Sequence, residues 1–194
     1  YAEDLLKKRV SRRRMDSEVA DATLARIHAT ADFADLAGCE LVIEAVFEDR
    51  GVKADVTQKA LAVTGDGIIF ASNTSTLPIT GLAKASSRPD NFIGLHFFSP
   101  VDRMPLVEII VGDATTDETL ARAMDYVMAI RKTPIVVNDS RGFYTSRVFA
   151  TYVREGLALL AEGVAPALIE NAGKMAGMPV GPLGMADEVS IDLM

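Results

Sequence analysis

The residues from 68 to 72 read Ile-Ile-Phe-Ala-Ser, an almost unbroken apolar run. A strand without polar alternation is typical of a parallel sheet that is buried on both faces. Parallel neighbours must be joined by crossover connections, and these are usually helices. This run therefore restricts the chain to folds in which helices alternate with strands and cover the sheet.

The chain up to residue 138 follows that alternation. Strand patterns occupy residues 41–46, 91–97, 106–111 and 134–137, and helical patterns occupy residues 2–13, 17–28, 49–63 and 117–131. Pro78 suits the first turn of a further short helix. We predict an α/β domain with a mainly parallel sheet over residues 1–138.

The pattern changes after Asn138. One long helix is predicted over 142–162 and a second from Pro166 to about Met175, followed by a loop over 177–184. Residues 138–142 are the predicted hinge. The expected second domain is all-helical and covers residues 139–194.

His96 and Glu108 lie in the strands 91–97 and 106–111, which Pro100 and Pro105 separate with a turn. If the strands pair antiparallel about Asp102, the two residues oppose each other, because each lies six positions from it. Opposed side chains share a face, with Cβ atoms roughly 5 Å apart. A carboxylate beside an imidazole fixes its tautomer and stabilises the imidazolium, which is what a general base requires. The alternative is a core histidine bonded to a carbonyl group, with a solvated glutamate nearby.

Polar residues follow other predicted strands. Glu48 comes after 41–46, and Asn73 and Ser75 come after 68–72. The carboxyl ends of parallel strands meet at one crevice, where open α/β sheets bind ligands. These residues and His96 are therefore predicted to gather there, although such short side chains also serve as helix caps or turn residues.

Composition excludes several classes of function. The chain has 194 residues, is 49% hydrophobic and carries a formal charge of −7, so binding to nucleic acid or to an anionic membrane is not expected. No apolar run approaches the roughly 18 residues of a membrane span. The single Cys39 cannot form an internal disulfide, and no residue spacing suggests a metal site.

Several strings of residues closely resemble the 3-hydroxyacyl-CoA dehydrogenases, in family order. They are Val42-Ile-Glu-Ala-Val46 with Glu48 and Lys53, Ala71-Ser-Asn-Thr-Ser75, Gly94-Leu-His-Phe-Phe-Ser-Pro100, Leu106-Val-Glu-Ile109, Gly142-Phe143 and Gly177-Met-Pro-Val-Gly-Pro182. The resemblance implies a Rossmann-like, NAD-binding domain and oxidation of the 3-hydroxyl group of an acyl-CoA to a ketone in fatty-acid β-oxidation.

The resemblance also implies residue roles. His96 would be the catalytic base, with Glu108 as its partner. Ser75 would hydrogen-bond the C3 oxygen of the substrate. Glu48, Lys53 and Asn73 would lie against the nicotinamide half of NAD.

Two departures from the family pattern concern the substrate and the cofactor. Ser146 occupies a position where the family often has Asn, so it either donates one hydrogen bond to the substrate oxygen or simply packs in its helix. Such a small hydroxyl residue resembles the large multifunctional fatty-acid oxidation subunits. No GxGxxG turn occurs in the chain, although that turn cradles the dinucleotide pyrophosphate. The interpretation is a piece truncated at both ends, without the first strand and the glycine-rich loop.

The basic cluster near the N-terminus comprises Lys7, Lys8, Arg9, Arg12, Arg13 and Arg14. It is either a solvated helix face or a site for coenzyme A phosphates, as the resemblance implies, with Lys8 and Arg12 as the contacts.

Alternative functions are a non-catalytic relative that binds NAD or is structural, and a dehydrogenase of free 3-hydroxy acids. A homodimer or a larger fatty-acid oxidation complex is expected, in the bacterial cytoplasm or, for a eukaryotic protein, the mitochondrial matrix.

Overall fold

The computed structural model of the chain describes residues 1–65 and 67–189. The chain divides into two compact units, Tyr1–Ala37 and Gly38–Met194. In the parts of the chain that the structure describes, no helix combines the length and the apolarity needed to cross a bilayer.

The first unit holds the helices α1 (Ala2–Ser11) and α2 (Ser17–Leu24) and the short helix η1 (Phe33–Leu36). Both α-helices end earlier than predicted. Arg13 has a left-handed backbone, with φ of 54°, and a helix of L-residues cannot continue through that conformation. The second helix ends four residues before the predicted residue 28.

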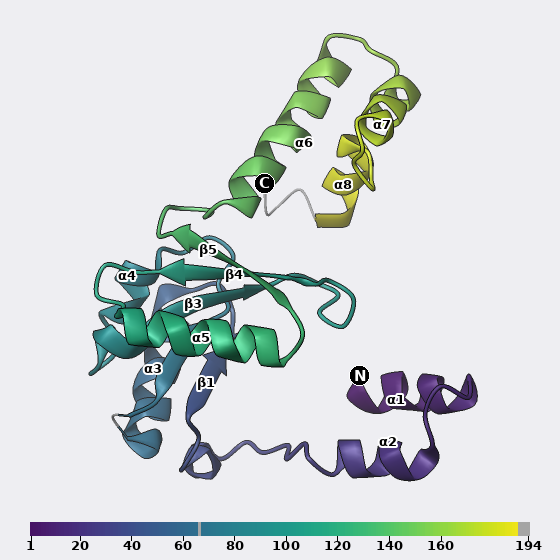
Figure 1. Cartoon of the computed structure of the whole chain (residues 1–194). Coiled ribbons are helices and arrows are strands. Elements are labelled where there is room, and N and C mark those ends of the chain that lie inside the picture. Colours follow the sequence, from purple (N-terminus) through teal and green to yellow (C-terminus); the bar gives the residue numbers. More distant parts are fainter. Residues whose placement is uncertain (66, 190–194) are drawn as a thin grey trace. The chain divides into compact units, whose positions relative to one another are not determined.

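The second unit is built on a five-stranded sheet in the order β1-β2-β3-β4-β5 (Figure 1). The strands are β1 (Leu41–Glu44), β2 (Ile69–Ser72), β3 (Phe92–Phe97), β4 (Leu106–Val111) and β5 (Thr133–Asn138). All neighbouring strands pair parallel except β3 and β4, which pair antiparallel. The predicted α/β fold with a mainly parallel sheet is confirmed.

Helices cover the two faces of this sheet. They are α3 (Arg50–Thr64), α4 (Ile79–Ala83), the short helix η2 (Pro89–Asn91) and α5 (Asp117–Ala129). The side chain of Asp49 caps α3 by accepting a hydrogen bond from the Val52 amide at 2.9 Å. The helix α5 packs across β3, β4 and β5 (Figure 1).

Alternate residues of β3 and β4 point to opposite faces of the sheet. The face toward α5 forms the main core, which comprises Ile69, Ala71, Ile93, Leu95, Val107, Ile109, Ala123 and Val127. His96 and Glu108 therefore lie on the other face. On that face α4 approaches closely, since a Cβ atom at Gly94 would lie 2.8 Å from the Cδ1 atom of Ile79. A side chain at position 94 would push α4 away from the sheet.

The helical segment after β5 consists of α6 (Thr145–Ala161), α7 (Pro166–Met175) and α8 (Pro182–Val189). The predicted start of α6 at residue 142 was wrong, because Gly142 and Phe143 adopt left-handed backbones with φ of 75° and 48°. The predicted loop over 177–184 was wrong at its end. Pro182 begins α8, and the Glu170 carboxylate accepts hydrogen bonds from the Leu183 and Gly184 amides at 2.8 and 3.1 Å.

Candidate active site

His96 and Glu108 are register partners across the antiparallel pair β3 and β4. The Nδ1 atom of His96 lies 2.8 Å from the Oε2 atom of Glu108. Glu108 is completely buried and His96 is 7% exposed. The predicted opposition of the two side chains is confirmed. The histidine is bonded to the carboxylate, not to a carbonyl group.

The Glu108 carboxylate also receives three hydrogen bonds from the start of α6. Its Oε1 atom accepts from the backbone amides of Tyr144 and Thr145 at 3.1 and 2.8 Å. Its Oε2 atom accepts from the Thr145 hydroxyl at 2.7 Å. A helix N-terminus carries unpaired N–H groups and a partial positive charge, both of which favour an anion. Sequence reasoning missed Thr145, because the predicted start of α6 at residue 142 placed Thr145 inside the helix.

Glu108 is held in its ionised form. Burial alone raises the pKa of its carboxyl group, but the hydrogen bonds from His96 and Thr145 outweigh burial and lower the pKa below the ordinary glutamate value. An ionised carboxylate only accepts hydrogen bonds. In the neutral imidazole, Nδ1 of His96 therefore carries the proton of the shared bond, and Nε2 has the lone pair that can take a substrate proton.

The lowered pKa predicts how the Glu108→Gln variant responds to pH. Glu108 stabilises the fold at pH values above the unfolded glutamate pKa of about 4.3, and this contribution disappears as the pH falls through the lower folded value. We expect the variant to have a lower free energy of unfolding than the wild type at pH 7. The difference between the two free energies should become smaller as the pH falls. Urea unfolding at a series of pH values measures this difference. A difference that stays constant from pH 7 to pH 3 would contradict the assignment.

Aromatic rings surround the imidazole of His96. The ring centroid of Phe98 lies 4.4 Å away and that of Phe143 lies 6.3 Å away. Phe143 is buried and belongs to the left-handed turn that precedes α6. These rings limit the access of water to the imidazole, and a less polar environment strengthens its hydrogen bond with Glu108.

The loop after β2 reaches the same region. The Asn73 side-chain oxygen accepts a hydrogen bond from the Phe97 amide at 2.8 Å, next to His96 in the sequence. Ser75 is exposed, and its amide donates to the Oε1 atom of Glu48 at 3.0 Å. The same carboxylate oxygen accepts from the Thr76 amide at 3.1 Å and from the Thr74 hydroxyl. Glu48 thus fixes the backbone of the loop that carries Ser75.

Lys53 forms ion pairs with both Glu48 and the buried Glu44 of β1. Its side chain is 2% exposed, and its ammonium lies 3.0 Å from the Glu44 carboxylate and 3.3 Å from that of Glu48. Glu44 is buried too and accepts a hydrogen bond from the Ser72 hydroxyl. Burial raises the pKa of Glu48, but the Thr74 hydrogen bond and the Lys53 charge together lower it. The ammonium of Lys53 is therefore directed at protein carboxylates, and Glu44 is a member of the site that sequence reasoning missed.

Ser146 connects α6 to the loop of Ser75. The Ser146 hydroxyl donates a hydrogen bond to the Ser75 carbonyl oxygen at 3.3 Å. Seven of the predicted residues are thus brought together: His96, Glu108, Ser75, Ser146, Asn73, Glu48 and Lys53. Two features of the sequence indicate this cluster: the polar residues at the ends of the predicted strands and the glycine at position 142, before α6.

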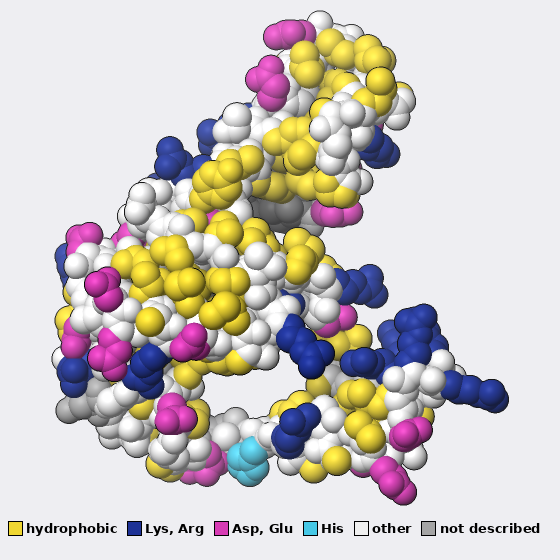
Figure 2. All heavy atoms as spheres, viewed as in Figure 1, with side chains coloured by type: hydrophobic (Ala, Val, Ile, Leu, Met, Phe, Trp, Pro, Cys, Tyr) yellow, Lys and Arg dark blue, Asp and Glu magenta, His cyan; other side chains and the backbone are white. Residues whose placement is uncertain are grey.

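The basic cluster lies in the first unit. Its side chains gather over α1 and the turn that follows it (Figure 2). Lys8 and Arg12 are exposed, and the Arg12 amide bonds the Lys8 carbonyl oxygen at 3.2 Å. Lys7 differs, because it pairs with Glu3 at 2.6 Å. The predicted role of Lys8 and Arg12 in binding coenzyme A stays a prediction.

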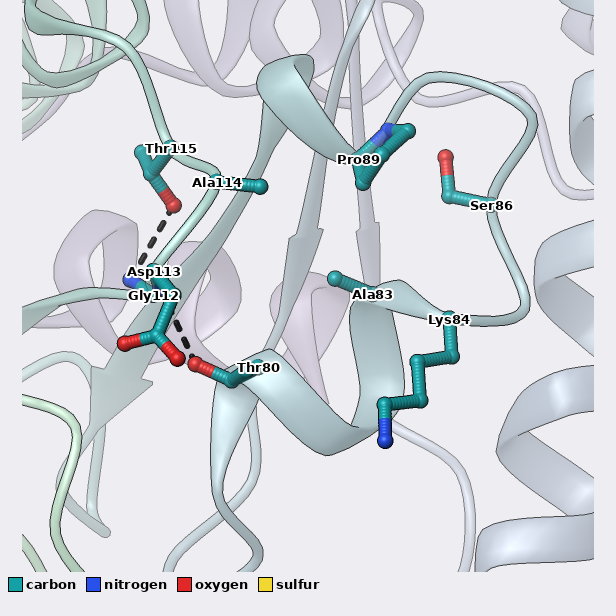
Figure 3. A pocket seen from close by; sticks show the side chains of 9 residues that line it. All are labelled: Thr80, Ala83, Lys84, Ser86, Pro89, Gly112, Asp113, Ala114 and Thr115. Atoms are coloured by element: carbon teal, nitrogen blue, oxygen red, sulfur yellow. Dashed lines mark hydrogen bonds between the residues drawn. The ribbon is translucent and has the colours of Figure 1, made fainter.

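A cavity of ≈ 320 Å³ lies at the opposite end of β3 and β4 from His96. It is lined by residues of α4 and of the segment after β4, including Thr80, Lys84 and Asp113 (Figure 3). None of the predicted site residues lines this cavity. Within residues 1–65 and 67–189, no three His, Cys, Asp or Glu side chains are placed to ligate a metal ion.

The fold and the cluster define a class of protein: an α/β sheet domain with a buried histidine–carboxylate pair at a strand end, continued by a helical segment. The sequence model of the "3-hydroxyacyl-CoA dehydrogenase, NAD binding domain" matches residues 1–140, and that of the corresponding "C-terminal domain" matches residues 142–194. The chain belongs to the 3-hydroxyacyl-CoA dehydrogenase family.

Similar proteins agree with this assignment. The fatty acid oxidation complex subunit alpha of Shewanella amazonensis is 45% identical over 193 residues, which are 100% of this chain and 27% of that protein. The chain thus spans about a quarter of the length of the curated relatives that it matches. The crystal structure of (S)-3-hydroxybutyryl-CoA dehydrogenase from Ralstonia eutropha is 36% identical, with a TM-score of 0.93 over 97% of this chain and 68% of that one. The 3-hydroxybutyryl-CoA dehydrogenase of Escherichia coli K12 is 33% identical, with a TM-score of 0.93 over 99% of this chain and 41% of that one.

Proposed function

We propose that this chain is the dehydrogenase portion of a larger polypeptide that oxidises L-3-hydroxyacyl-CoA to 3-ketoacyl-CoA with NAD in fatty-acid β-oxidation. The observation that carries the proposal is the 2.8 Å bond between His96 and Glu108 at the carboxyl end of β3. Family membership and the names of the similar proteins support the substrate class. The division into a sheet domain over 1–138 and a helical domain over 139–194 is proposed on the same grounds.

We assign each of these side chains a role in the proposed reaction. In the oxidation direction, the Nε2 atom of His96 takes the proton of the 3-hydroxyl group while the C3–H bond gives up its electron pair as hydride. Glu108 stabilises the imidazolium that forms. The Ser75 hydroxyl would hydrogen-bond the C3 oxygen and hold it near His96. The Ser146 hydroxyl, which donates to the Ser75 carbonyl oxygen, would turn from that bond to donate to the C3 oxygen as well. In the reverse reaction, the imidazolium returns the proton to the developing alkoxide.

We assign the nicotinamide half of NAD to the ends of β1 and β2. Phe47 after β1 is 86% exposed and Ser75 after β2 is exposed as well. Asn73 bonds Phe97 through its oxygen, and its amide group carries two further donors. Bound NAD supplies the hydride acceptor. Glu48 and Asn73 would contact the cofactor, and Lys53 would act by holding Glu48 in place. The pyrophosphate cradle has no candidate within the 194 residues, so we assign it to the rest of the polypeptide.

The proposed activity is tested by the oxidation of NADH in the presence of acetoacetyl-CoA, followed by absorbance with the full-length polypeptide. We expect turnover of the thioester and a rate at least about 100-fold lower with free acetoacetate, because the acid lacks the binding energy of the coenzyme A moiety. Equal rates with both compounds would favour a dehydrogenase of free 3-hydroxy acids. No turnover of either compound would favour a non-catalytic relative.

We further propose that Lys8 and Arg12 bind the phosphates of coenzyme A. Replacing both with Gln should raise the KM for acyl-CoA about threefold to tenfold, the range for two exposed charge pairs, and leave the KM for NAD unchanged. The control is Arg154→Gln, which removes an exposed charge from α6. Steady-state kinetics would contradict the proposal if acyl-CoA and NAD were affected equally.

We infer a homodimer or a larger complex from the apolar surface of the helical segment. Large apolar side chains are exposed on α6 and α7, namely Val148, Leu157, Leu160, Leu168 and Met175, and Figure 2 shows apolar side chains over this part of the chain. Exposed apolar patches commonly mark association surfaces. The bacterial origin of the similar proteins supports a location in the bacterial cytoplasm.

A further inference from the structure

We propose that the Thr145 hydroxyl is a positioning group that sets the strength of the hydrogen bond between Glu108 and His96. This inference rests on the proposed function, in which His96 is the base. Thr145 and His96 both donate to the Oε2 atom of Glu108, at 2.7 and 2.8 Å. The two donors therefore share the charge of one carboxylate oxygen.

The other carboxylate oxygen fixes the orientation of the group. The Oε1 atom of Glu108 accepts from two successive amides, those of Tyr144 and Thr145. Rotation of the carboxylate would break both bonds inside a fully buried site, where an unmade hydrogen bond is costly. Oε2 is thus held toward His96, and the Thr145 hydroxyl is the one partner of Oε2 that a side-chain substitution can remove without disturbing the histidine.

Among the residues that the structure describes, the Glu108 carboxylate contacts one titratable side chain. From β3 this contact is His96 itself. From β5 the register partner is Ile135, which does not titrate. From α6 the contacts are Thr145 and the backbone amide of Tyr144, whose ring is exposed. Removing the Thr145 hydroxyl therefore changes the hydrogen bond of His96, because both groups donate to the same carboxylate oxygen.

Without the Thr145 hydroxyl, the Oε2 atom of Glu108 has one donor fewer and is a stronger acceptor for the imidazolium of His96. A stronger acceptor stabilises the charged form of its partner. In Thr145→Val, which keeps the shape of the side chain, the base should lose its proton at higher pH. We expect the midpoint of the pH profile of kcat/KM for oxidation to rise by about 0.5 to 1 pH unit. A shift of this size corresponds to the net free energy of one hydrogen bond. Thr145→Ser keeps the donor and should retain the wild-type midpoint.

Two measurements on the full-length polypeptide test this inference. The first is the pH profile of kcat/KM for wild type, Thr145→Val and Thr145→Ser. The second is the NMR titration of histidine ring signals in the same proteins, with His96→Gln to assign the His96 signal, and it needs no enzymatic activity. Thr145→Ala replaces Thr145→Val if the latter does not fold.

A higher midpoint in the variants without the hydroxyl, and not in Thr145→Ser, supports the inference. An unchanged midpoint, or the same shift in Thr145→Ser, overturns it. A merely structural role would lower kcat without moving the midpoint, and would overturn it too. If the wild type oxidises no 3-hydroxyacyl-CoA, the proposed function fails, while the NMR titration still decides the role of Thr145.

Discussion

The His96→Gln variant is expected to lose most of its turnover, by about 10²- to 10⁴-fold, the usual contribution of a positioned general base. Glutamine is polar and similar in length, but its amide cannot take up a proton near neutral pH. The KM for acyl-CoA and the affinity for NAD should change little, because the proposed cofactor contacts lie at the ends of β1 and β2. Steady-state kinetics and calorimetric titration with NAD measure the two effects.

The chain supplies a matched control for this variant. His28, the other histidine, lies in the first unit with its side chain 79% exposed. His28→Gln should keep wild-type turnover. If His96→Gln retained more than a tenth of the wild-type rate, His96 would not be the base.

The Lys53→Met variant is expected to lower the free energy of unfolding by about 3–5 kcal/mol, the cost of leaving one partner of a buried ion pair without the other. Lys53 and Glu44 are both almost fully buried, and their charged groups are 3.0 Å apart. Methionine fills a similar volume, so the loss reflects mainly the uncompensated Glu44 carboxylate. Urea unfolding measures this loss.

A control and a rescue separate charge from packing. Lys59→Met removes an exposed pair with Asp55 from the same helix, where the Lys59 side chain is 56% exposed, and should cost no more than about 0.5 kcal/mol. Adding Glu44→Gln to Lys53→Met should recover much of the lost stability, because the buried charge is removed. A Lys53→Met variant as stable as Lys59→Met would show that the Glu44–Lys53 pair contributes little.

The pairing of His96 with Glu108 could be predicted from sequence because it depends on short-range rules. Two strands of clear composition, separated by a turn between prolines, have few possible registers. The structure gives the predicted register. Asn73, Ser75 and Glu48 could be placed for a similar reason, since the carboxyl ends of adjacent parallel strands meet at one edge.

The contacts that cross between elements could not be predicted in the same way. The direction of the Thr145 hydroxyl depends on where α6 begins, and two left-handed residues shift that start to Thr145. Glu44 reads as part of an apolar strand, and its pairing with Lys53 depends on how α3 packs on β1. The start of α8 could have been predicted, because Pro182 is a common first residue of a helix.

A double-mutant cycle decides whether His96 and Glu108 act as one unit in catalysis. Turnover is measured for the wild type, His96→Gln, Glu108→Gln and the double variant. If Glu108 acts on the reaction through the imidazole, as proposed, the double variant should be about as slow as His96→Gln alone. If the two single losses multiplied in the double variant, Glu108 would act independently of His96, and the proposed unit would be contradicted.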